Sequence, residues 1–497
     1  MADIKFYLPL FIALPLSGAF LVSLLGKKFK VFSYAVTVGV CALMTFISLS
    51  VYFGEPMLGV VTYKMSGWPL PYGIVFVVDA LGLLVLTMIN TVAFIVALYS
   101  IPYVKRYTAS WKYYTLYLLM VAGMNGVAAT GDIFNLFVFL EIASIASYGL
   151  VAFGVEAEEL EASFKYMVLG TLGSLLFLLA IGFIYALTGT LNLADISQKL
   201  PLIDAMPKNF IIILLIVGLG IKAALVPFHS WLPDAYSSAP APISAMFSGV
   251  LIKTHGVYAL VRILFNVFGL TQMTSGIFMF LGSASMLIGV LLALYQWDFK
   301  RLLAYHSISQ IGYAILGIGL GTPLGVLGGL FHLVNHAIFK SLLFLNAGAV
   351  EYETGTRDLS KMGGLREQMP VTANTSLIAS MSIAGIPPFN GFWSKLIIIM
   401  AAVQANQYLW ATVAVISSIL TLASFLKVQK YAFSGHSHGM FEKIKEVPFA
   451  MMAAMIIFAF LCLLTSLPVV RERLIIPAVN ALLDGRYGEK VLAADKK

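Results

Sequence analysis

Apolar stretches of about 20 residues recur from one end of the chain to the other, and they constrain its fold more than any other feature. A helix of this length crosses the hydrocarbon core of a bilayer, which is about 30 Å thick. Of the 497 residues, 60% are hydrophobic and 11% are charged, whereas soluble domains contain about 25% charged residues. We therefore predict an all-α polytopic membrane protein.

The apolar stretches number about fourteen, and we predict that each forms a transmembrane helix. They lie near residues 6–26, 32–53, 74–99, 112–130, 133–153, 164–187, 209–228, 241–264, 272–296, 301–320, 324–348, 371–401, 408–430 and 448–468. We group them as helices 1–3 (1–110), helices 4–8 (111–265), helices 9–13 (266–432), and helix 14 with a C-terminal tail (433–497). Cys41 and Cys462 fall inside predicted helices, which favours buried thiols over a disulfide or a metal cluster.

The formal net charge of +8 comes largely from basic residues in short loops. With the helices counted as above, these loops share one side of the membrane, which the positive-inside rule places in the cytoplasm. They contain Lys27, Lys28, Lys30, Lys105, Arg106, Lys112, Lys300, Arg301, Lys443 and Lys445. An acidic loop on the same side, which has little influence on the rule, contains Glu156, Glu158, Glu159 and Glu161. We expect a multi-pass membrane protein, with both termini outside and no nucleic-acid partner.

Two predicted helices contain a break. Pro227 and Pro233 bracket a polar stretch in helix 7, and Pro387 and Pro388 follow Gly385 in helix 12. Proline removes a backbone donor and clashes with the preceding turn, so each helix is expected to split into two half-helices. Paired interruptions in the two halves of a transporter point to an ion site at the midplane of the membrane.

The two halves also share short sequence matches. The segment SLLFL occurs at 174–178 and again at 341–345. Asp132 before helix 5 corresponds to Asp298 before helix 10, within one residue of the same offset. Together with the paired breaks, these matches predict that helices 4–8 are repeated as helices 9–13. Since each unit has five helices, an odd number, the two repeats must be inverted.

Ionisable side chains inside the predicted helices are few, and most lie near the middle of a helix. They are Asp79, Glu141, Lys222, His229, Lys253, His255, His306, His332, His336, Lys340 and Lys395. Such groups are costly in a membrane and mark ion or proton pathways. Lysines, histidines and one glutamate in successive helices are what a proton relay needs, because each group must change its protonation state within the membrane.

Glu141 and Lys222 are expected to form an ion pair. Glu141 follows Asp132, the expected N-cap of its helix, by nine residues and so lies about 13 Å into the membrane. Lys222 precedes the Pro227 break and lies near the same depth. An unpaired charge at the centre of a span costs roughly 2.5 to 3.5 kcal/mol, which makes pairing the cheapest arrangement. Beside the carboxylate the lysine keeps its proton, and on separation burial favours release, which an arginine would not allow.

The other expected relay members lie near the middle of helix 8, on one face of helix 11, and after the second break. They are Lys253, His255, His332, His336, Lys340 and Lys395. The three residues on helix 11 are four residues apart and form a stripe of about 12 Å. Histidine titrates nearest to neutral pH, so such a stripe can pass protons through intervening water. Lys395 is expected to be the last member.

Other interpretations apply to some of these residues. His229 and His306 are equally compatible with a purely structural role, and Asp79 fits a structural or interface charge better than a relay member. His332 and His336 as axial haem ligands are disfavoured, because two histidines four residues apart on one helix face cannot straddle a porphyrin. We find no cofactor fingerprint, and expect no metal, cofactor or catalytic centre in this chain.

Several segments resemble the antiporter-like subunits of the complex I superfamily. They are FNLFVFLEIASIASYGLVAFG, TGTLNLADIS, GIKAALVPFHSWLPDAYSSAPAPISAMFSGVLIKTHGVYALVR and GIPPFNGFWSKL. The chain is most similar to the D subunit of Mrp-type cation/proton antiporters and to its counterpart in membrane-bound hydrogenases and related ferredoxin-linked complexes. The resemblance covers nearly the whole chain.

The resemblance implies fourteen helices, two inverted five-helix repeats, and breaks in helices 7 and 12. The charged residues and histidines of the family correspond here to Glu141, Lys222, Lys253, His332, His336 and Lys395. Where the family has either lysine or glutamate on helix 12, this chain has Lys395. The long lateral helix of complex I members is missing. The resemblance also implies that the chain works only with other membrane subunits, as a proton-translocating subunit of an Mrp-like or hydrogenase-like complex.

Two alternatives remain open from the sequence. One is a self-contained cation-coupled solute symporter, and the other is a redox membrane subunit that binds quinone or haem. The sequence also leaves open whether Na⁺ passes through this subunit, whether the complex is a standalone antiporter or redox-driven, and in which direction protons move.

Overall fold

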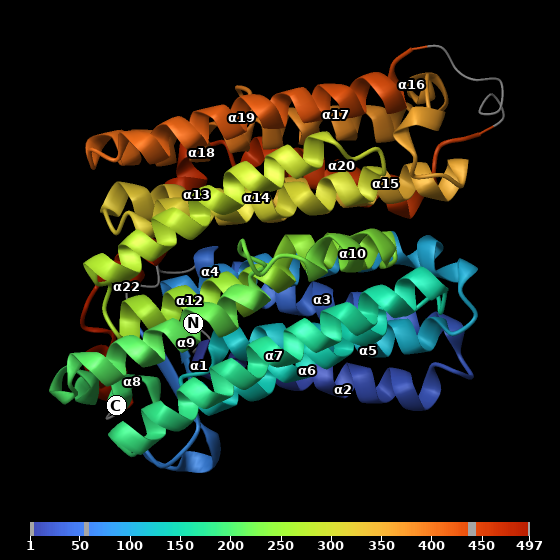
Figure 1. Cartoon of the computed structure of the whole chain (residues 1–497). Helices are drawn as coiled ribbons and strands as arrows, with labels where there is room; N and C mark the ends of the chain where they lie inside the picture. Colours follow the sequence, from blue (N-terminus) through green and yellow to red (C-terminus); the bar gives the residue numbers. More distant parts are fainter. Residues whose placement is uncertain (1–3, 54–58, 436–443, 496–497) are drawn as a thin grey trace.

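The computed structural model describes residues 4–53, 59–435 and 444–495, and most of this part is helical (Figure 1). The long helices run roughly along one common direction, so their ends form two opposite faces of an elongated bundle. Within the described residues, ten helices are long and apolar enough to cross a membrane. The number becomes eleven if Phe449–Leu464 and Pro468–Leu483, which meet at 86°, form one bent span. The predicted all-α polytopic fold is confirmed at this level.

The elements follow one another in four stretches of the chain. The first contains α1 (Ile4–Tyr7), α2 (Leu10–Leu25), α3 (Lys30–Phe53), β1 (Val61–Lys64), β2 (Val75–Val78) and α4 (Ala80–Tyr103). The second contains α5 (Ser110–Ala129), α6 (Ile133–Val151), α7 (Ala157–Thr188), α8 (Leu193–Lys199), α9 (Ala205–Lys222), α10 (Trp231–Ser238), α11 (Ala241–Met246) and α12 (Ala259–Val261). The third contains α13 (Gln272–Leu294), α14 (Phe299–Gly319), α15 (Pro323–Thr354), α16 (Leu365–Gln368), α17 (Pro370–Ala384), α18 (Asn390–Gln404) and α19 (Tyr408–Val428). The last contains α20 (Phe449–Leu464), α21 (Pro468–Val470), α22 (Ile476–Leu483) and α23 (Tyr487–Asp495).

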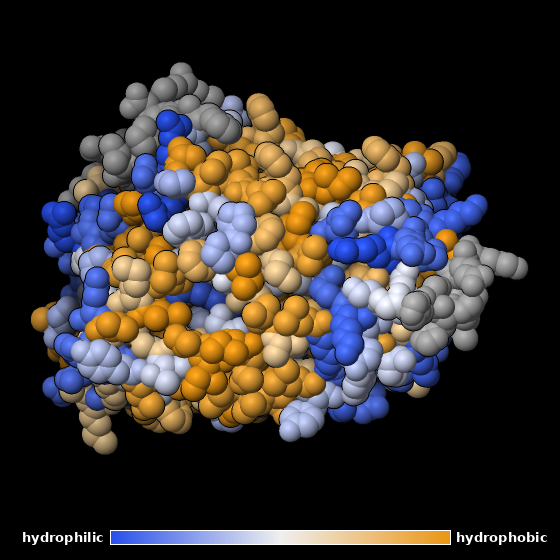
Figure 2. Space-filling view, turned by 90° about the horizontal axis from the view of Figure 1, so that it is seen from above, coloured by the Kyte–Doolittle hydropathy of each residue, from blue (hydrophilic) through white to orange (hydrophobic). Residues whose placement is uncertain are grey.

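The outer surface has the distribution of polarity that a bilayer requires. Figure 2 shows apolar side chains across the middle of the molecule and hydrophilic side chains gathered towards its two ends. The exposed apolar residues of α7 illustrate this band: Phe164, Met167, Val168, Leu172, Leu175, Leu179 and Phe183. Cys41 and Cys462 are both free and buried, as predicted.

A β-hairpin replaces the beginning of the third predicted helix. Val75–Val78 pairs antiparallel with Val61–Lys64, and α4 begins only at Ala80. The Asp79 carboxylate accepts a hydrogen bond from Gly82 N (2.8 Å) and caps the helix. The prediction of a helix from residue 74, with Asp79 inside the span, was therefore wrong, because an aspartate in extended backbone ends the strand and starts the helix.

The predicted acidic loop is also corrected. Glu156 is the N-cap of α7, and it forms a capping box with Glu159. The other glutamates of this group lie in the first turns of α7, where carboxylates interact favourably with the positive end of the helix dipole. As a result, α7 begins at Ala157, seven residues before the predicted start at 164.

The structure contains both predicted breaks. α9 ends at Lys222 and α10 begins at Trp231, while α17 ends at Ala384 and α18 begins at Asn390. At the first break, the Trp231 indole donates to Ile221 O (2.9 Å), which holds the two half-helices together. At the second break, Gly385 has a φ of 83°, a left-handed conformation that glycine adopts without steric cost. These turns bring polar backbone groups into the interior of the bundle.

The core of the bundle contains a long helix with three π-helical turns. It runs without interruption from Ala241 to Val267. The π-helical turns are Phe247–Leu251, Lys253–Tyr258 and Arg262–Val267. All residues from Ala241 to Val267 are buried, as are residues 328–350 of α15. π-Helical turns occur frequently at functional sites, and here one of them contains Lys253 and His255.

Two helices of equal length end in matching turns. α7 and α15 each have 32 residues and are followed by a glycine with positive φ, Gly189 (67°) and Gly355 (71°). Thr188 Oγ1 donates to the carbonyl four residues earlier (2.8 Å) and accepts from the amide two residues later (3.4 Å). Thr354 makes the same two contacts at 2.7 and 3.3 Å.

The segments after these glycines pair in the same way. Asp132 forms an isolated β-bridge with Asn192, and Asp298 forms one with Asp358. In Figure 1, α8, which follows the first turn, lies at the end of the bundle where the C-terminus is drawn, whereas α16 lies at the opposite end. The two matching motifs therefore lie on opposite faces of the bundle.

The basic loops meet at one end of the bundle, which we call the basic face. Gly26, in the first of these loops, packs against Trp111 at the start of α5. Arg106 and Lys300 line one common cavity at this end. Lys443 lies outside the described residues. Lys300, expected in a short loop, instead lies in the first turn of α14, which already begins at Phe299, and has 1% of its surface exposed.

Candidate functional site

The predicted ion pair is present at the junction of α6, α7 and α9. Lys222 Nζ lies 3.2 Å from a carboxylate oxygen of Glu141 and donates to the Ser144 hydroxyl (2.9 Å). The Ser174 hydroxyl on α7 also donates to Glu141. Lys222 is 5% exposed, whereas the Glu141 side chain is 25% exposed. The lysine is therefore enclosed by the protein, while the glutamate reaches its lateral surface.

The break after α9 packs against the central helix beside His255. A Cβ atom built on Gly256 would come within 2.4 Å of Ala223 Cβ, so glycine is needed for this close approach. His255 is 2% exposed, and its Nε2 has no hydrogen-bond partner among the described residues. The structure therefore brings His255 next to the Lys222 end of α9, without a direct hydrogen bond between their side chains in the described part of the chain.

A chain of contacts joins Lys253 to Lys340 through two serines. Lys253 Nζ donates to Ser248 O, and the Ser248 and Ser307 hydroxyls are 2.8 Å apart. Ser307 donates to Leu303 O (3.1 Å), and Lys340 Nζ donates to the same carbonyl. Neither serine was predicted as a site residue from the sequence. The sequence shows only that each serine lies on a predicted helix. Nothing in it indicates that the two helices pack against each other at these positions.

His332 and His336 stack on one face of α15, as predicted. Their rings are 6.2 Å apart and inclined by 10°. His332 Nδ1 is 3.0 Å from the hydroxyl of Ser394, the neighbour of Lys395. Neither ring nitrogen of His336 has a hydrogen-bond partner within the described residues, although the side chain is fully buried. The stripe thus connects the centre of the bundle with α18.

Lys395 ends this line at the second break. Its Nζ donates to Ile383 O (2.7 Å) and lies 3.4 Å from the Ser418 hydroxyl. Lys395 is only 3% exposed, but it borders a crevice of about 280 Å³ between α17, α18 and α19 at the lateral surface, where Ile419 is 62% exposed. The freed carbonyl of the broken helix therefore binds the ammonium group.

Two further histidines have different surroundings. His306 is fully buried, and its Nε2 is 2.8 Å from the Ser424 hydroxyl. His229 lies half-buried in the first break. These positions fit structural roles, since neither contacts the side chains described above through a hydrogen bond in the described part of the structure.

Asp79 forms a buried ion pair that was not predicted from the sequence. Arg262 donates to both carboxylate oxygens, at 2.7 and 2.6 Å, and the two residues are each 4% exposed. Arg262 lies in the last π-helical turn of the central helix. Its side chain also donates to Asn266 (2.9 Å), whose amide donates to the carbonyls of Ala481 and Leu482. The pair thus ties the C-terminal helices to the core, which fits a structural role for Asp79.

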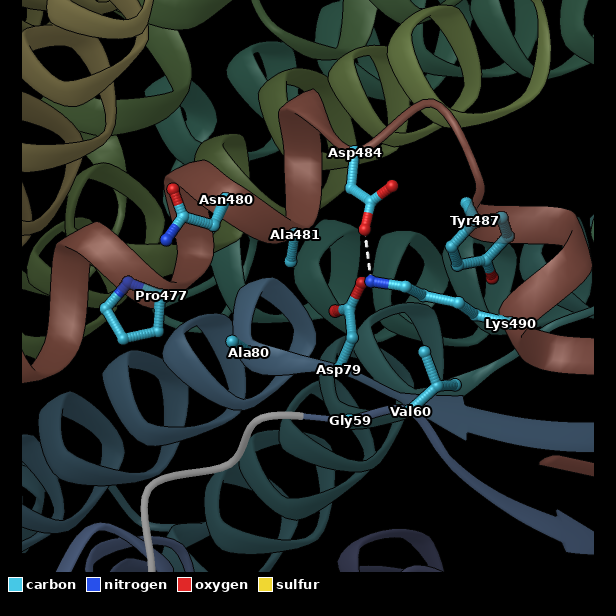
Figure 3. Close-up of a pocket in the computed structure, with 10 residues that line it drawn as sticks. All are labelled: Gly59, Val60, Asp79, Ala80, Pro477, Asn480, Ala481, Asp484, Tyr487 and Lys490. Carbon is cyan, nitrogen blue, oxygen red and sulfur yellow. Dashed lines mark hydrogen bonds and ion pairs between the residues drawn. The ribbon is translucent and has the colours of Figure 1, made fainter.

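A small pocket lies above this pair at the face opposite the basic face. Figure 3 shows Asp79 at its base, below Asp484, Tyr487 and Lys490 of the C-terminal segment. The pocket has a volume of about 160 Å³. Lys490 and Arg486 bind Asp484, outside the spans, and hold the pKa of its carboxyl below the ordinary value. The C-terminal tail is therefore folded onto the bundle.

Arg262→Met is expected to lower the stability of the folded chain by roughly 3 to 5 kcal/mol, because it leaves Asp79 buried and unpaired. The measurement is thermal unfolding of the purified complex in detergent. Replacing both partners, in Asp79→Leu with Arg262→Met, should recover part of the loss. Arg301→Met, which removes a partly exposed ion pair with Asp234, should change stability by less than about 1 kcal/mol. Equal effects for Arg262 and Arg301 would contradict a special role for the buried pair.

Comparison with known proteins identifies relatives over most of the chain. The family described as NADH:quinone oxidoreductase/Mrp antiporter, TM, matches residues 130–421. The N subunit of NADH-quinone oxidoreductase from Desulforudis audaxviator is 40% identical over 388 residues, 76% of either chain. The D subunit of a Na⁺/H⁺ antiporter from Alkalihalophilus pseudofirmus is 37% identical over 408 residues, 82% of either chain.

A solved structure agrees with these sequence matches. A chain in the structure of the Mrp complex from Dietzia superimposes with a TM-score of 0.91 at 30% identity. The superposition covers 99% of the present chain and 100% of that chain. The resemblance found in the sequence motifs is therefore confirmed, and the chain belongs to the NADH:quinone oxidoreductase/Mrp antiporter transmembrane family.

Proposed function

We propose that this chain is an antiporter-like, proton-translocating subunit of a multisubunit membrane complex of the Mrp or complex I type. One observation carries the proposal: a line of buried ionisable side chains crosses the bundle laterally from the Glu141–Lys222 pair to Lys395. The proposed relay members are Glu141, Lys222, Lys253, His255, His332, His336, Lys340 and Lys395. Buried ionisable groups in a membrane are expensive, and a line of them marks an ion or proton pathway.

The proposed step at Glu141 and Lys222 depends on their separation. In contact, the carboxylate stabilises the lysine ammonium; when the two move apart, burial favours the neutral amine, and the proton moves on. The break next to Lys222, with Pro227 and Pro233, allows α9 and α10 to move relative to each other. The second break, with Pro387 and Pro388, gives Lys395 the same freedom.

We also propose fourteen transmembrane helices and two inverted repeats. In this arrangement α9 with α10, and α17 with α18, each form one broken span, and α5, α14 and α20 complete the count. The repeats comprise residues 111–265 and 266–432, preceded by 1–110 and followed by 433–497. The matching threonine turns and β-bridges on opposite faces of the bundle support this arrangement.

The location and partners follow from the same proposal. Relatives are named as subunits, and the matching solved chain comes from an Mrp complex. We therefore place the chain in the plasma membrane of a prokaryote, beside other membrane subunits. The 25% exposure of the Glu141 side chain on an apolar lateral surface is consistent with a neighbouring subunit in the complete complex.

Purification of the intact complex tests this proposal. Reconstituted in liposomes, the complex is expected to move protons, measured by quenching of a pH-sensitive dye, whereas the isolated chain should not. Co-purified hydrogenase or ferredoxin-oxidising subunits would indicate a redox-driven complex, and only small hydrophobic subunits an antiporter. Transport of a solute by the isolated chain would instead support a symporter, and a haem spectrum in the purified chain would support a redox protein.

A further inference from the structure

A polar vestibule opens at the basic face between the two halves of the bundle. It has a volume of about 780 Å³. Its walls come from the loops that follow α4, α6, α10 and α15 and from the first turn of α14. One water molecule occupies about 30 Å³ in the liquid, so the vestibule has room for a continuous chain of water.

The vestibule is lined by more acidic than basic groups. Its carboxylates are Glu156, Glu158, Glu159, Asp298, Glu351 and Asp358, and its cations are Arg106, Lys300 and Arg357. The Ser360 hydroxyl donates to Asp358 (2.7 Å) and holds the pKa of that carboxyl below its ordinary value. The excess of carboxylates attracts cations and disfavours phosphate or acidic ligands.

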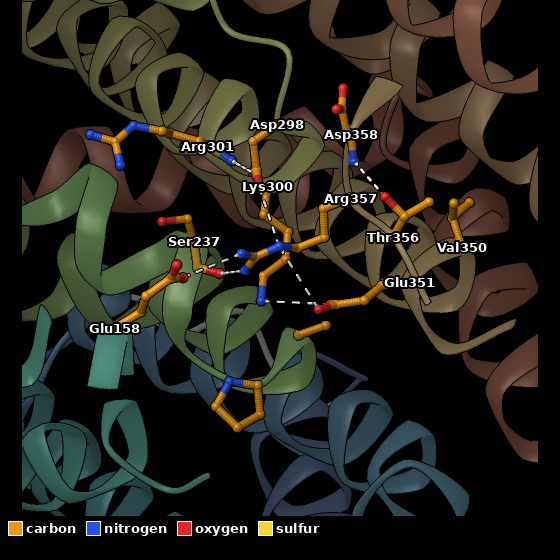
Figure 4. Close-up of polar contacts among 12 residues, drawn as sticks. Glu158, Ser237, Asp298, Lys300, Arg301, Val350, Glu351, Thr356, Arg357 and Asp358 are labelled. Atoms are coloured by element: carbon orange, nitrogen blue, oxygen red, sulfur yellow. Dashed lines mark hydrogen bonds and ion pairs between the residues drawn. The ribbon is translucent and has the colours of Figure 1, made fainter. Parts of the chain in front are cut away.

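Arg357 holds the walls of the vestibule together. It donates to Ser237 O (2.6 Å) at the end of α10, and its Nε lies 3.2 Å from Asp298 and 3.9 Å from Glu351. Figure 4 shows it between α10 and the end of α15, with Glu158 on the outer side. The arginine therefore connects elements from both halves and keeps Glu351 facing the cavity.

Lys300 forms the inner end of the vestibule. Its side chain is 2% exposed, and its Nζ donates to Ala239 O (2.5 Å) and lies 3.8 Å from Glu351. Lys300 is one helical turn before Leu303 on α14, and Leu303 O accepts a hydrogen bond from Lys340 Nζ. The vestibule thus ends one helical turn from the carbonyl that binds Lys340, on the same helix that contributes Ser307.

We infer that this vestibule is the inlet through which protons pass between the aqueous phase at the basic face and Lys340, with Glu351 and Lys300 as the first two protonatable groups. The inference rests on the proposed function, since it requires that Lys340 belongs to a proton relay.

Each transfer in this inlet moves one proton and needs no co-reactant other than water. The Lys300 ammonium gives its proton, through water, to the neutral amine of Lys340. Glu351 in its acid form then reprotonates the Lys300 amine, and a hydronium ion in the vestibule reprotonates the Glu351 carboxylate. The net result is one proton taken from the aqueous phase and one proton added to Lys340. While Lys300 carries its proton, its buried ammonium repels a metal cation at the inner end of the vestibule.

Two substitutions test the inlet directly. Lys300→Met and Glu351→Gln are each expected to lower proton translocation by the reconstituted complex at least tenfold. The matched control is Lys361→Gln, which removes a 73%-exposed lysine on the same face and should leave the rate within twofold of the wild-type value. Co-purification of the other subunits checks that each variant assembles.

A labelling experiment tests the inlet even if Lys300→Met or Glu351→Gln fails to assemble. Ser238 lines the vestibule without a hydrogen bond from its side chain among the described contacts. In a complex with Cys41→Ala and Cys462→Ala, we expect Ser238→Cys to react with a membrane-impermeant, cationic thiol reagent only from the basic face. The reaction should block proton translocation, whereas modification of Lys361→Cys should not.

The outcomes separate this inference from the proposed function. If Lys253→Met and Lys340→Met stop translocation but Lys300→Met and Glu351→Gln translocate at the wild-type rate, the relay stands and the inlet is overturned. Labelling of Ser238→Cys without loss of translocation would also overturn the inlet. If Lys253→Met and Lys340→Met translocate normally, the proposed relay itself is wrong.

Discussion

Glu141→Gln and Lys222→Ala are each expected to abolish cation-coupled transport while the complex still assembles. The Lys222 ammonium has two polar side-chain partners, Glu141 at 3.2 Å and Ser144 at 2.9 Å. Glutamine cannot supply the charge that stabilises the ammonium, and alanine removes the group that carries the proton. The measurement is proton uptake into inverted membrane vesicles, together with co-purification of the other subunits.

The controls must separate transport from folding. Removing one partner of a buried ion pair costs up to about 3 to 5 kcal/mol, because the other charge is left uncompensated. The double variant Glu141→Gln with Lys222→Leu leaves no charge behind and should assemble as well as the wild type, yet remain inactive. Lys199→Gln, which removes a lysine paired with Asp195 at 2.9 Å outside the relay, should transport normally. Near-normal transport in either single variant would remove the pair from the mechanism.

The sequence was most informative where the type of a residue and its depth in the membrane decide the structure. Pro227 and Gly385 can each be recognised as helix breakers, and the structure has a break at each. The pairing of Glu141 with Lys222 could be predicted from the sequence alone, because two opposite charges at the same depth in lipid are most stable as an ion pair. His332 and His336 share a face of α15 because four residues make approximately one helical turn.

The sequence was least informative where tertiary packing decides the contact. Arg262 interrupts a run of apolar residues, and no pattern along the chain indicates that it reaches Asp79, which precedes it by 183 positions. The serine pair Ser248 and Ser307 depends in the same way on how the central helix packs against α14. A serine in an apolar helix is common and predicts nothing by itself. Only the structure shows that the hydroxyls of Ser248 and Ser307 lie 2.8 Å apart.

Helix starts were misplaced for a different reason. Hydropathy locates the apolar part of a span, but capping decides where the helix begins. Glu156 and Glu159 form a capping box that extends α7 into residues expected to be a loop. Lys300 follows the Asp298 cap and therefore points into the bundle from the first turn of α14 instead of lying in solvent. Because Lys300 was expected in a loop, the sequence did not predict the vestibule that it lines.

Lys395→Leu is expected to block proton translocation, whereas Lys395→Glu should retain part of it. A relay member needs a titratable group that water can bridge, more than one particular geometry. Lys395 contacts Ile383 O at 2.7 Å and borders a crevice of about 280 Å³, so a shorter glutamate can still exchange protons through water there. Leucine offers no such group. The measurement is proton translocation by the reconstituted complex.

A matched lysine on the next helix provides the control for Lys395. Lys427 of α19 donates to the carbonyls of Leu294 and Gln296, at 2.8 and 2.7 Å, near the basic face. Lys427→Leu is therefore expected to affect stability but not the rate of translocation per assembled complex. In Lys395→Leu, the Glu141 end should still exchange protons, because the block lies beyond His332. Normal translocation by Lys395→Leu, or a dry layer of leucines between Lys253 and Lys395 in a high-resolution map, would contradict the lateral path.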